Sequence, residues 1–267
     1  YTKADPRRPG KIRIETPNHA RALLPGFGFN VKALPILSVF GGIHKGFAPP
    51  SASLYQKAES SVNVEMGMRL TTNKMKLEAI VFNNNYSNML GSDLAAQGGQ
   101  GTLEQFNVGK AMVNGLELMF QYLPLPKHFA FQLPIQLSYT YTNTQMKNDF
   151  ESSAWGHVHY GDEIPYIYKH AFNAQISLEH KRVEANFGAR FNGDMRTTPG
   201  QGKIAEREKI PAHVILDASL KVHVNKNITI SLNGINLANK KYLVSRHPSG
   251  LRAGHPLGVY GGLRLQL

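Results

Sequence analysis

The amino-acid sequence predicts an all-β fold, an antiparallel transmembrane β-barrel, from three observations. Apolar and polar residues alternate with a period of two along most of the 267 residues, as in strands with one apolar and one polar face. Short turns and long polar connections follow each other in regular alternation. No run approaches the roughly 18 apolar residues that a membrane-spanning helix needs. Strands, and not helices, are therefore expected to cross any membrane.

About eleven strands are expected, at residues 21–33, 36–47, 61–72, 75–86, 107–122, 132–146, 169–181, 183–196, 211–224, 227–241 and 256–267. Each is near or above the roughly 9 to 11 residues with which a tilted strand crosses a bilayer. The alternation is clearest in 213–224, where one face would carry Val214, Leu216, Ala218, Leu220, Val222 and Val224. We call such an apolar face the dry face, and the polar face opposite to it the wet face.

The connections favour a membrane barrel over a soluble one. Short turns are expected at 33–35, 73–74, 124–128, 181–182 and 225–227, and long loops at 48–60, 87–106, 145–168, 197–210 and 243–255. Outer-membrane barrels have tight turns on the periplasmic side and long loops outside. Pro49 and Pro50 would then end a strand at the outer rim. A large soluble sandwich remains the alternative, and it would bury the apolar rows against a second layer.

The expected number of strands is odd, whereas single-chain bacterial barrels have an even number and cannot leave an edge unpaired in lipid. The sheet is therefore expected to be part of a larger barrel. The formal charge of +12 fits an anionic ligand or membrane surface. Nucleic acid is a poor fit, because the basic residues are scattered singly. The absence of cysteine excludes disulfides and thiol catalysis.

Five segments resemble a known family when they are read in order. They are "LPGFGFNV" followed by "SVFGGIHKGFAPPS", "AESSVNVEMGMRL", "NVGKAMVNGLELMFQY", "GDEIPYIYKHAFN", and "NGINLANKKYL" followed by "SGLRAGHPLGVYGGLRLQL". The chain resembles the C-terminal part of TonB-dependent outer-membrane receptors, most closely the ferric dicitrate receptor group. The motif positions that carry the resemblance include Glu65, Gly67, Asn107, Gly109, Gly115, Leu116 and Glu117.

The resemblance implies a plug domain followed by a 22-stranded barrel, of which residues 1–267 would be the C-terminal portion without the plug. It implies an outer-membrane receptor for a ferric chelate, energised by the TonB complex through a missing N-terminal region. Lipid and lipopolysaccharide would surround the barrel. The alternatives are a passive pore, a degenerate barrel without a plug, or a receptor for heme, cobalamin or a nickel chelate. The chain is expected to be a fragment or a truncated gene product.

No enzyme activity, catalytic residue or cofactor is expected, because chelate transport makes no bond and no nucleophile-elbow sequence is present. His157 and His159 have a His-x-His spacing, but no third ligand is evident, so no metal site is predicted. An anionic chelate would suit arginine. The candidate ligand-binding residues near the outer rim are Arg196, Arg207, Arg246 and Arg252.

Charged residues on the wet face are expected to form a salt-bridge ladder that keeps a wide barrel rigid, with lining of a lumen as the alternative role. A charge is retained there more easily than on the lipid side, where it costs about 2 to 4 kcal/mol near the midplane. The residues are Glu65, Arg69, Lys76, Glu78, Glu117, Glu184, Arg190, Asp217, Lys221 and Arg264.

Overall fold

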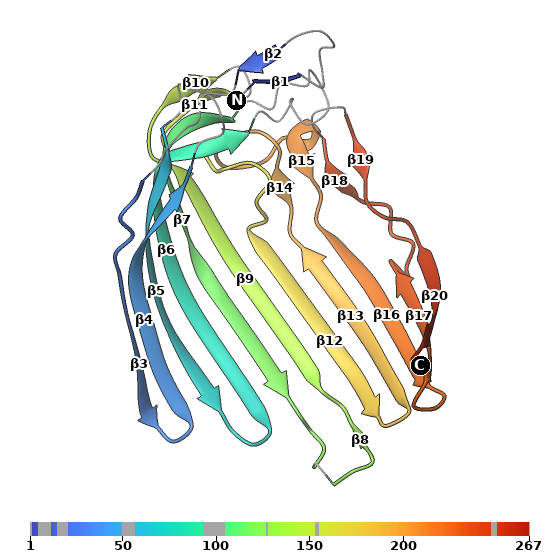
Figure 1. Cartoon of the computed structure of the whole chain (residues 1–267). Helices are drawn as coiled ribbons and strands as arrows, with labels where there is room; N and C mark the ends of the chain where they lie inside the picture. Colours follow the sequence, from blue (N-terminus) through green and yellow to red (C-terminus); the bar gives the residue numbers. More distant parts are fainter. Residues whose placement is uncertain are drawn as a thin grey trace.

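The computed structural model describes residues 2–4, 12–14, 21–49, 57–92, 105–126, 128–152, 155–246 and 250–266. Its main feature is one curved antiparallel sheet whose strands are neighbours in chain order (Figure 1). All eleven expected strands are present: β3 (Gly26–Leu34), β4 (Leu37–Ala48), β5 (Glu59–Thr71), β6 (Met75–Ser92), β7 (Gln105–Tyr122), β9 (Ile135–Met146), β12 (His170–His180), β13 (Val183–Asn192), β16 (His213–His223), β17 (Ile228–Ile235) and β20 (Gly258–Leu265). The all-β prediction is confirmed.

The two ends of the sheet are open edges. Among the described residues, β3 pairs only with β4, and β20 pairs only with β17. Every residue of β3 is exposed. An unpaired edge presents free N–H and C=O groups, which lipid cannot satisfy. The sheet is therefore a curved part of a barrel wall, as the odd number of strands predicted.

The dry face is exposed. On β5 it carries Val62, Val64, Met66 and Met68, and the side chain of Met66 is 55% exposed. Ile176 on β12 and Val81 on β6 are similarly exposed. No second layer of described residues covers these rows, as a soluble sandwich would require. Exposed apolar rows along tilted strands are typical of a surface that meets hydrocarbon.

The buried apolar cluster lies at the outer end of the wall and not beneath the sheet. It consists of Val108, Ala111, Met146, Val158 and Ile164. Val158 and Ile164 come from the connection between β9 and β12, which folds onto the outer ends of β7 and β9. The connection contains the hairpin β10 (Phe150–Ser152) and β11 (Gly156–Val158). This cluster fixes the position of the outer rim.

The wet face carries ion pairs across neighbouring strands. The Arg69 guanidinium pairs with Glu78, and Arg190 Nη2 lies 3.0 Å from Asp217 Oδ2. Lys221 Nζ lies 3.4 Å from Glu184 Oε2. The predicted ladder is confirmed for these six residues. No ion pair within the described residues involves the other four predicted members, Glu65, Lys76, Glu117 and Arg264.

Two glycines of the wet face lie beneath aromatic rings of the neighbouring strand. A Cβ on Gly67 would lie 2.5 Å from Phe40 Cζ, and a Cβ on Gly115 would lie 2.7 Å from Phe82 Cζ. The register places Phe40 opposite Gly67 and Phe82 opposite Gly115. An aromatic ring that covers a cross-strand glycine restores the packing that the missing side chain would provide.

Several predicted strand ends are wrong by a few residues, for identifiable reasons. The strand expected at 132–146 is interrupted by Pro134, which cannot donate to the ladder. Only β8 (Phe131–Gln132) and β9 remain of it. The strand expected at 227–241 ends at Ile235, because Asn236 adopts a φ of 50°. Asn236 is fully buried, and its Nδ2 donates to Lys240 O (2.9 Å) and His255 O (2.8 Å).

Other differences lie at the outer rim. β13 ends at Asn192, whereas the prediction continued to 196, where β14 (Met195–Arg196) pairs instead with β15 (Lys209–Ile210). The expected loop 87–106 is shorter, because β6 and β7 reach Ser92 and Gln105. Pro50, and with it most of the loop 48–60, lies outside the described residues.

The long connections gather at one end of the wall and the short turns at the other (Figure 1). The long-loop end also holds η1 (Glu206–Glu208), β18 (Leu243–Ser245), β19 (Arg252–Ala253), β1 (Thr2–Ala4) and β2 (Ile12–Ile14). No helix in the described part of the chain is long and apolar enough to span a membrane.

Candidate functional site

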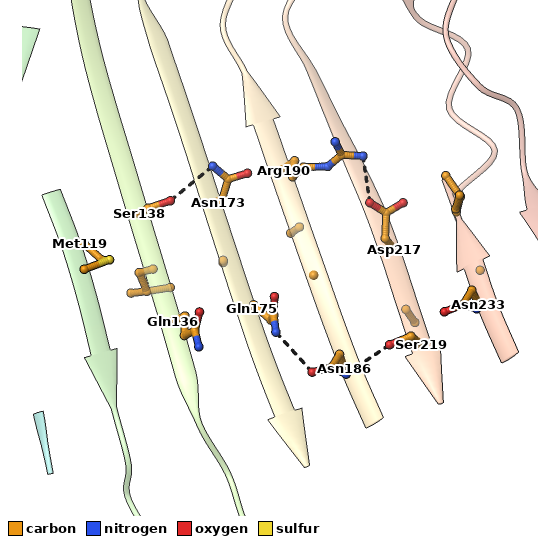
Figure 2. A pocket seen from close by; sticks show the side chains of 17 residues that line it. Met119, Gln136, Ser138, Asn173, Gln175, Asn186, Arg190, Asp217, Ser219 and Asn233 are labelled. Atoms are coloured by element: carbon orange, nitrogen blue, oxygen red, sulfur yellow. Dashed lines mark hydrogen bonds and ion pairs between the residues drawn. The ribbon is translucent and has the colours of Figure 1, made fainter. Parts of the chain in front are cut away.

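The inner wall contains a hollow of about 650 Å³ at mid-height, lined by both polar and apolar residues. The side chains labelled in Figure 2 come from the wet face of β7, β9, β12, β13, β16 and β17. Strand alternation places every second residue of these strands there. The polar lining consists of Gln136, Ser138, Asn173, Gln175, Asn186, Arg190, Asp217, Ser219 and Asn233. Met119 supplies an apolar contact at one side.

Most of this lining is uncharged and already hydrogen-bonded across the strands. Asn173 Nδ2 donates to Ser138 Oγ (3.3 Å), and Gln175 Nε2 donates to Asn186 Oδ1 (3.3 Å) (Figure 2). Asn186 Nδ2 donates in turn to Ser219 Oγ (3.2 Å). The one charged pair in the hollow is Arg190 with Asp217, whose charges cancel. The amide and hydroxyl groups of the hollow could exchange their present hydrogen-bond partners for a polar solute. The lining carries no net charge.

A second hollow, of about 290 Å³, lies at the outer rim above β13 and β16. Its lining includes four cations, Lys169, Arg196, Lys203 and Lys209, and two acids, Glu163 and Asp194. Arg196 belongs to the set of arginines that the sequence predicts. The three lysines were not in that set, although their positions in or beside the long loops were the signal that could have identified them.

Arg196 braces the rim from within. Its side chain is 6% exposed, its Nε donates to Glu163 Oε2 (2.8 Å), and its Nη2 donates to Gly202 O (3.0 Å). Glu163 also lies 3.5 Å from Lys169 Nζ. The Arg196 guanidinium is therefore engaged by the loops on both sides of it.

Arg246 holds the same rim segment, 197–210, from the other side. Its Nε donates to Lys209 O (2.8 Å) and its Nη2 donates to Glu206 O (3.0 Å). Lys209 pairs with Glu206, and its hydrogen bond and charge hold the pKa of Glu206 below its usual range. The segment is thus held by hydrogen bonds from both Arg246 and Arg196.

The other two predicted arginines are exposed. The side chain of Arg207, in η1, is 87% exposed, and its Nε lies 3.4 Å from Glu208 Oε1. Arg252 is exposed on β19, whose partner strand β18 contacts β15. The structure therefore brings Arg196, Arg207 and Arg246 to one segment and Arg252 to the adjoining hairpin. Their role in ligand binding stays a prediction.

His157 and His159 lie in and just after β11. His157 Nε2 is 3.3 Å from Glu151 Oε1, and both side chains are exposed. No group of three His, Asp or Glu side chains within the described ranges is placed to hold a metal ion.

An aromatic cluster at the rim was missed by the sequence reasoning. The ring of the buried His213 lies 4.6 Å from that of Tyr242 and 6.2 Å from that of Tyr168, measured between centroids. Burial raises the pKa of Tyr168, so this phenol stays protonated. These residues belong to three different segments, so no short motif indicates their contact.

An exposed apolar outer face, a polar inner face, and a rim of long loops that carries several cations together define the wall of an outer-membrane barrel. The family described as TonB dependent receptor-like, beta-barrel, matches residues 2–237. The chain belongs to this family, whose members lie in the outer membrane of Gram-negative bacteria.

Known siderophore receptors are among the similar proteins. The probable TonB-dependent siderophore receptor PiuA of Acinetobacter baumannii is 27% identical over 149 residues, which cover 54% of this chain and 19% of that protein. The chain thus spans about a fifth of the length of this curated relative.

Solved receptors show the same fold. The ferric-catecholate import receptor Fiu of E. coli K12, in its closed form, gives a TM-score of 0.67 at 21% identity, covering 90% of this chain and 34% of Fiu. The crystal structure of PiuA gives 0.67 at 18% identity, covering 90% and 35%. A mutant of the ferric enterobactin receptor PfeA of Pseudomonas aeruginosa, in complex with enterobactin, gives 0.66 at 17% identity, covering 91% and 40%.

Proposed function

We propose that this chain forms the C-terminal wall of an outer-membrane receptor that binds and imports a ferric chelate with anionic oxygen groups, of the ferric dicitrate type. The observation that supports it most is the position of the rim hollow, which carries four cations and two acids and lies beyond the outer ends of β13 and β16, two of the strands that line the inner hollow. Family membership and the siderophore receptors among its relatives support a ferric chelate in general. The carboxylate chemistry is our inference from the rim cations.

The rim supplies the chemistry that an anionic chelate needs. Arginine forks make paired hydrogen bonds to carboxylates, and lysines add positive charge. Arg207 and Arg252 are exposed and would make the first contacts. Arg196 and Arg246 would keep the rim segment in place and contribute their charge to the same region. Import in this way requires no bond to be made or broken, so the function is that of a receptor and not of an enzyme.

The partners follow from the same proposal. The dry face would contact outer-membrane lipid, and the exposed rim cations would also meet the phosphates of lipopolysaccharide. A plug, and the segment that engages the energy-supplying TonB complex, would be contributed by residues outside this chain.

The test is uptake of radioactive iron by cells that carry or lack the intact gene. Radioactive iron would be presented as ferric citrate, ferric enterobactin or heme. Labelled cobalamin and a labelled nickel chelate would be presented in separate assays. We expect saturable uptake that depends on the TonB complex and on an anionic ferric chelate. Saturable uptake of heme, cobalamin or nickel alone would contradict the ferric-chelate assignment.

A passive pore is the outcome that would contradict energised import. In that case iron would enter in proportion to its concentration, without saturation and without need of the TonB complex. Measuring uptake in cells without a functional TonB complex separates the two cases in one experiment.

A further inference from the structure

The short-turn end of the inner wall carries a second cationic hollow, of about 630 Å³. Its lining includes Lys181 and Arg182 from the turn between β12 and β13, Lys226 from the turn between β16 and β17, and Arg264 from β20. His223 lies among them. Within the described ranges, no acidic residue lines this hollow.

The register places this cluster on the wet face. Lys221 on β16 lies opposite Glu184 on β13 and forms an ion pair with it, so both side chains lie on the wet face. His223 and Arg264 follow on the same face, because Thr229 pairs with both in the sheet. The His223 backbone N–H donates to Arg182 O (2.8 Å) beside them. His223 and Arg264 thus lie on the wet face, and Lys181, Arg182 and Lys226 line the same hollow at the end opposite the rim.

The four cations keep their charge available. Glu184 is occupied by Lys221 (3.4 Å) and by His223 Nε2 (3.0 Å). Lys181, Arg182, Lys226 and Arg264 are exposed, and none of them forms an ion pair within the described residues. A purely structural wall would gain by pairing these charges, as it does for Arg190 and Asp217, because like charges around one hollow repel. Cations without an acidic partner are suited to reversible binding of an anion.

Three hollows therefore follow one another along the direction of β13 and β16, from the outer rim to the short turns. Their net charges alternate. The rim hollow is cationic, the middle hollow is lined by uncharged amides and one cancelled ion pair, and the short-turn hollow is cationic again. Conduction requires sites that attract a solute strongly enough to enter and hold it weakly enough to leave. A neutral middle between two attractive ends meets this requirement for an anion.

We propose that the inner face of β12, β13, β16 and β17 is the track along which an anionic chelate crosses, and that Lys181, Arg182, Lys226 and Arg264 form its exit site. This inference rests on the proposed import function and adds a second anion site to it. The exit site draws the chelate away from the neutral middle, after which water and counterions compete for the same cations and release it. Ferric citrate and ferric enterobactin, both anionic, are suitable probes.

The test uses the full-length receptor in cells, with the double substitution Arg182→Gln and Arg264→Gln. The matched control is Lys32→Gln with Lys74→Gln, which removes the same charge from the same end of the wall, on β3 and at the turn before β6. The conservative variant Arg182→Lys with Arg264→Lys keeps the charge. Surface binding of the chelate and the rate of its uptake at saturation are measured separately, after heat-modifiable gel migration has shown that each variant folds.

We expect the exit variant to bind the chelate at the surface as the wild type does. Its saturated uptake should fall by about tenfold, the lower end of what electrostatic focusing contributes to rates. The control and the lysine variant should keep most of the wild-type rate. Equal uptake by the exit variant and the control would overturn the exit site, and so would a loss of surface binding that accounts for the loss of uptake.

The two proposals fail in different ways. If the wild type imports neither probe with energy from the TonB complex, the import function falls and the exit site with it. If the wild type imports a probe and the exit variant does so equally well, the exit site alone falls.

Discussion

Arg196 and Glu163 form an ion pair that connects two long loops of the outer rim: Nε and Oε2 are 2.8 Å apart, and the Arg196 side chain is 6% exposed. The contact joins the connection that precedes β12 to the one that follows β13. The residue that the sequence identified as a ligand-binding candidate is therefore also a brace of the rim. Its two roles can be separated by experiment.

The bracing role predicts that Arg196→Gln loosens the segment 197–210. Removing the guanidinium leaves Glu163 with Lys169 alone, and loss of a charged partner costs about 1 to 3 kcal/mol. We expect tryptic cleavage after Lys203 or Arg207 to accelerate about tenfold, because cleavage follows the population of the locally opened segment. Arg190→Gln, which breaks an ion pair on the wall, is the control and should leave the cleavage rate unchanged. Unchanged cleavage in Arg196→Gln would refute the brace.

The capture role predicts that Arg207→Ala with Arg252→Ala weakens binding of an anionic ferric chelate. Both side chains are exposed and outside the buried brace, so the rim should stay folded. We expect the Kd to rise about five- to twentyfold, and the dependence of binding on salt to decrease, because two charged contacts are lost. Equilibrium binding of radioactive ferric citrate measures both effects. Wild-type affinity in the double variant would remove these two arginines from the site.

Alanine substitutions at the two wet-face glycines, Gly67 and Gly115, should differ in whether a smaller neighbouring side chain restores stability. Gly67→Ala would place its Cβ 2.5 Å from the Phe40 ring and 2.9 Å from the backbone O of Ala79, whereas Gly115→Ala would place its Cβ only 2.1 Å from the backbone O of Tyr141. We expect each substitution to cost about 1 to 3 kcal/mol. Phe40→Leu should partly rescue Gly67→Ala, because the ring makes its closest contact. Phe82→Leu should fail to rescue Gly115→Ala, because the much closer contact with the Tyr141 backbone would remain. Denaturant unfolding of each double variant, compared with its phenylalanine single variant, checks this. Equal rescue at both glycines would show that the ring contacts do not decide the cost.

The strands were predictable because each has to present a dry and a wet face over the width of a bilayer. Alternation identified all eleven strands and placed Ile176 and Gln175 on opposite faces. The strand ends were less predictable, because they depend on single contacts. Asn236 stops β17 through hydrogen bonds to Lys240 and His255, and the second of these partners is 19 residues away in the sequence.

The site was predictable only in outline. Charge and loop position pointed to the outer rim, and Arg196, Arg207 and Arg246 do meet around one segment. The sequence could not show that Arg196 and Arg246 are engaged by loop partners, because Glu163 and the Lys209 carbonyl reach them only in the folded rim. The motif glycines Gly67 and Gly115 were recognised by resemblance. Why glycine stands there, beneath a ring from the neighbouring strand, is visible only in the folded sheet.

The central claim is that one exposed face of this wall meets hydrocarbon and the other meets water, and cysteine scanning of β12 tests it most directly. This chain contains no cysteine, so single cysteines would be placed at positions 172, 173, 175 and 176 of the full-length receptor, with any cysteines elsewhere removed. Phe172, Asn173, Gln175 and Ile176 are all exposed in the structure, so exposure alone does not distinguish them. A charged maleimide applied to intact membranes should label Asn173→Cys and Gln175→Cys, and should label Phe172→Cys and Ile176→Cys only after denaturation. Equal labelling of all four positions in the membrane would contradict the account.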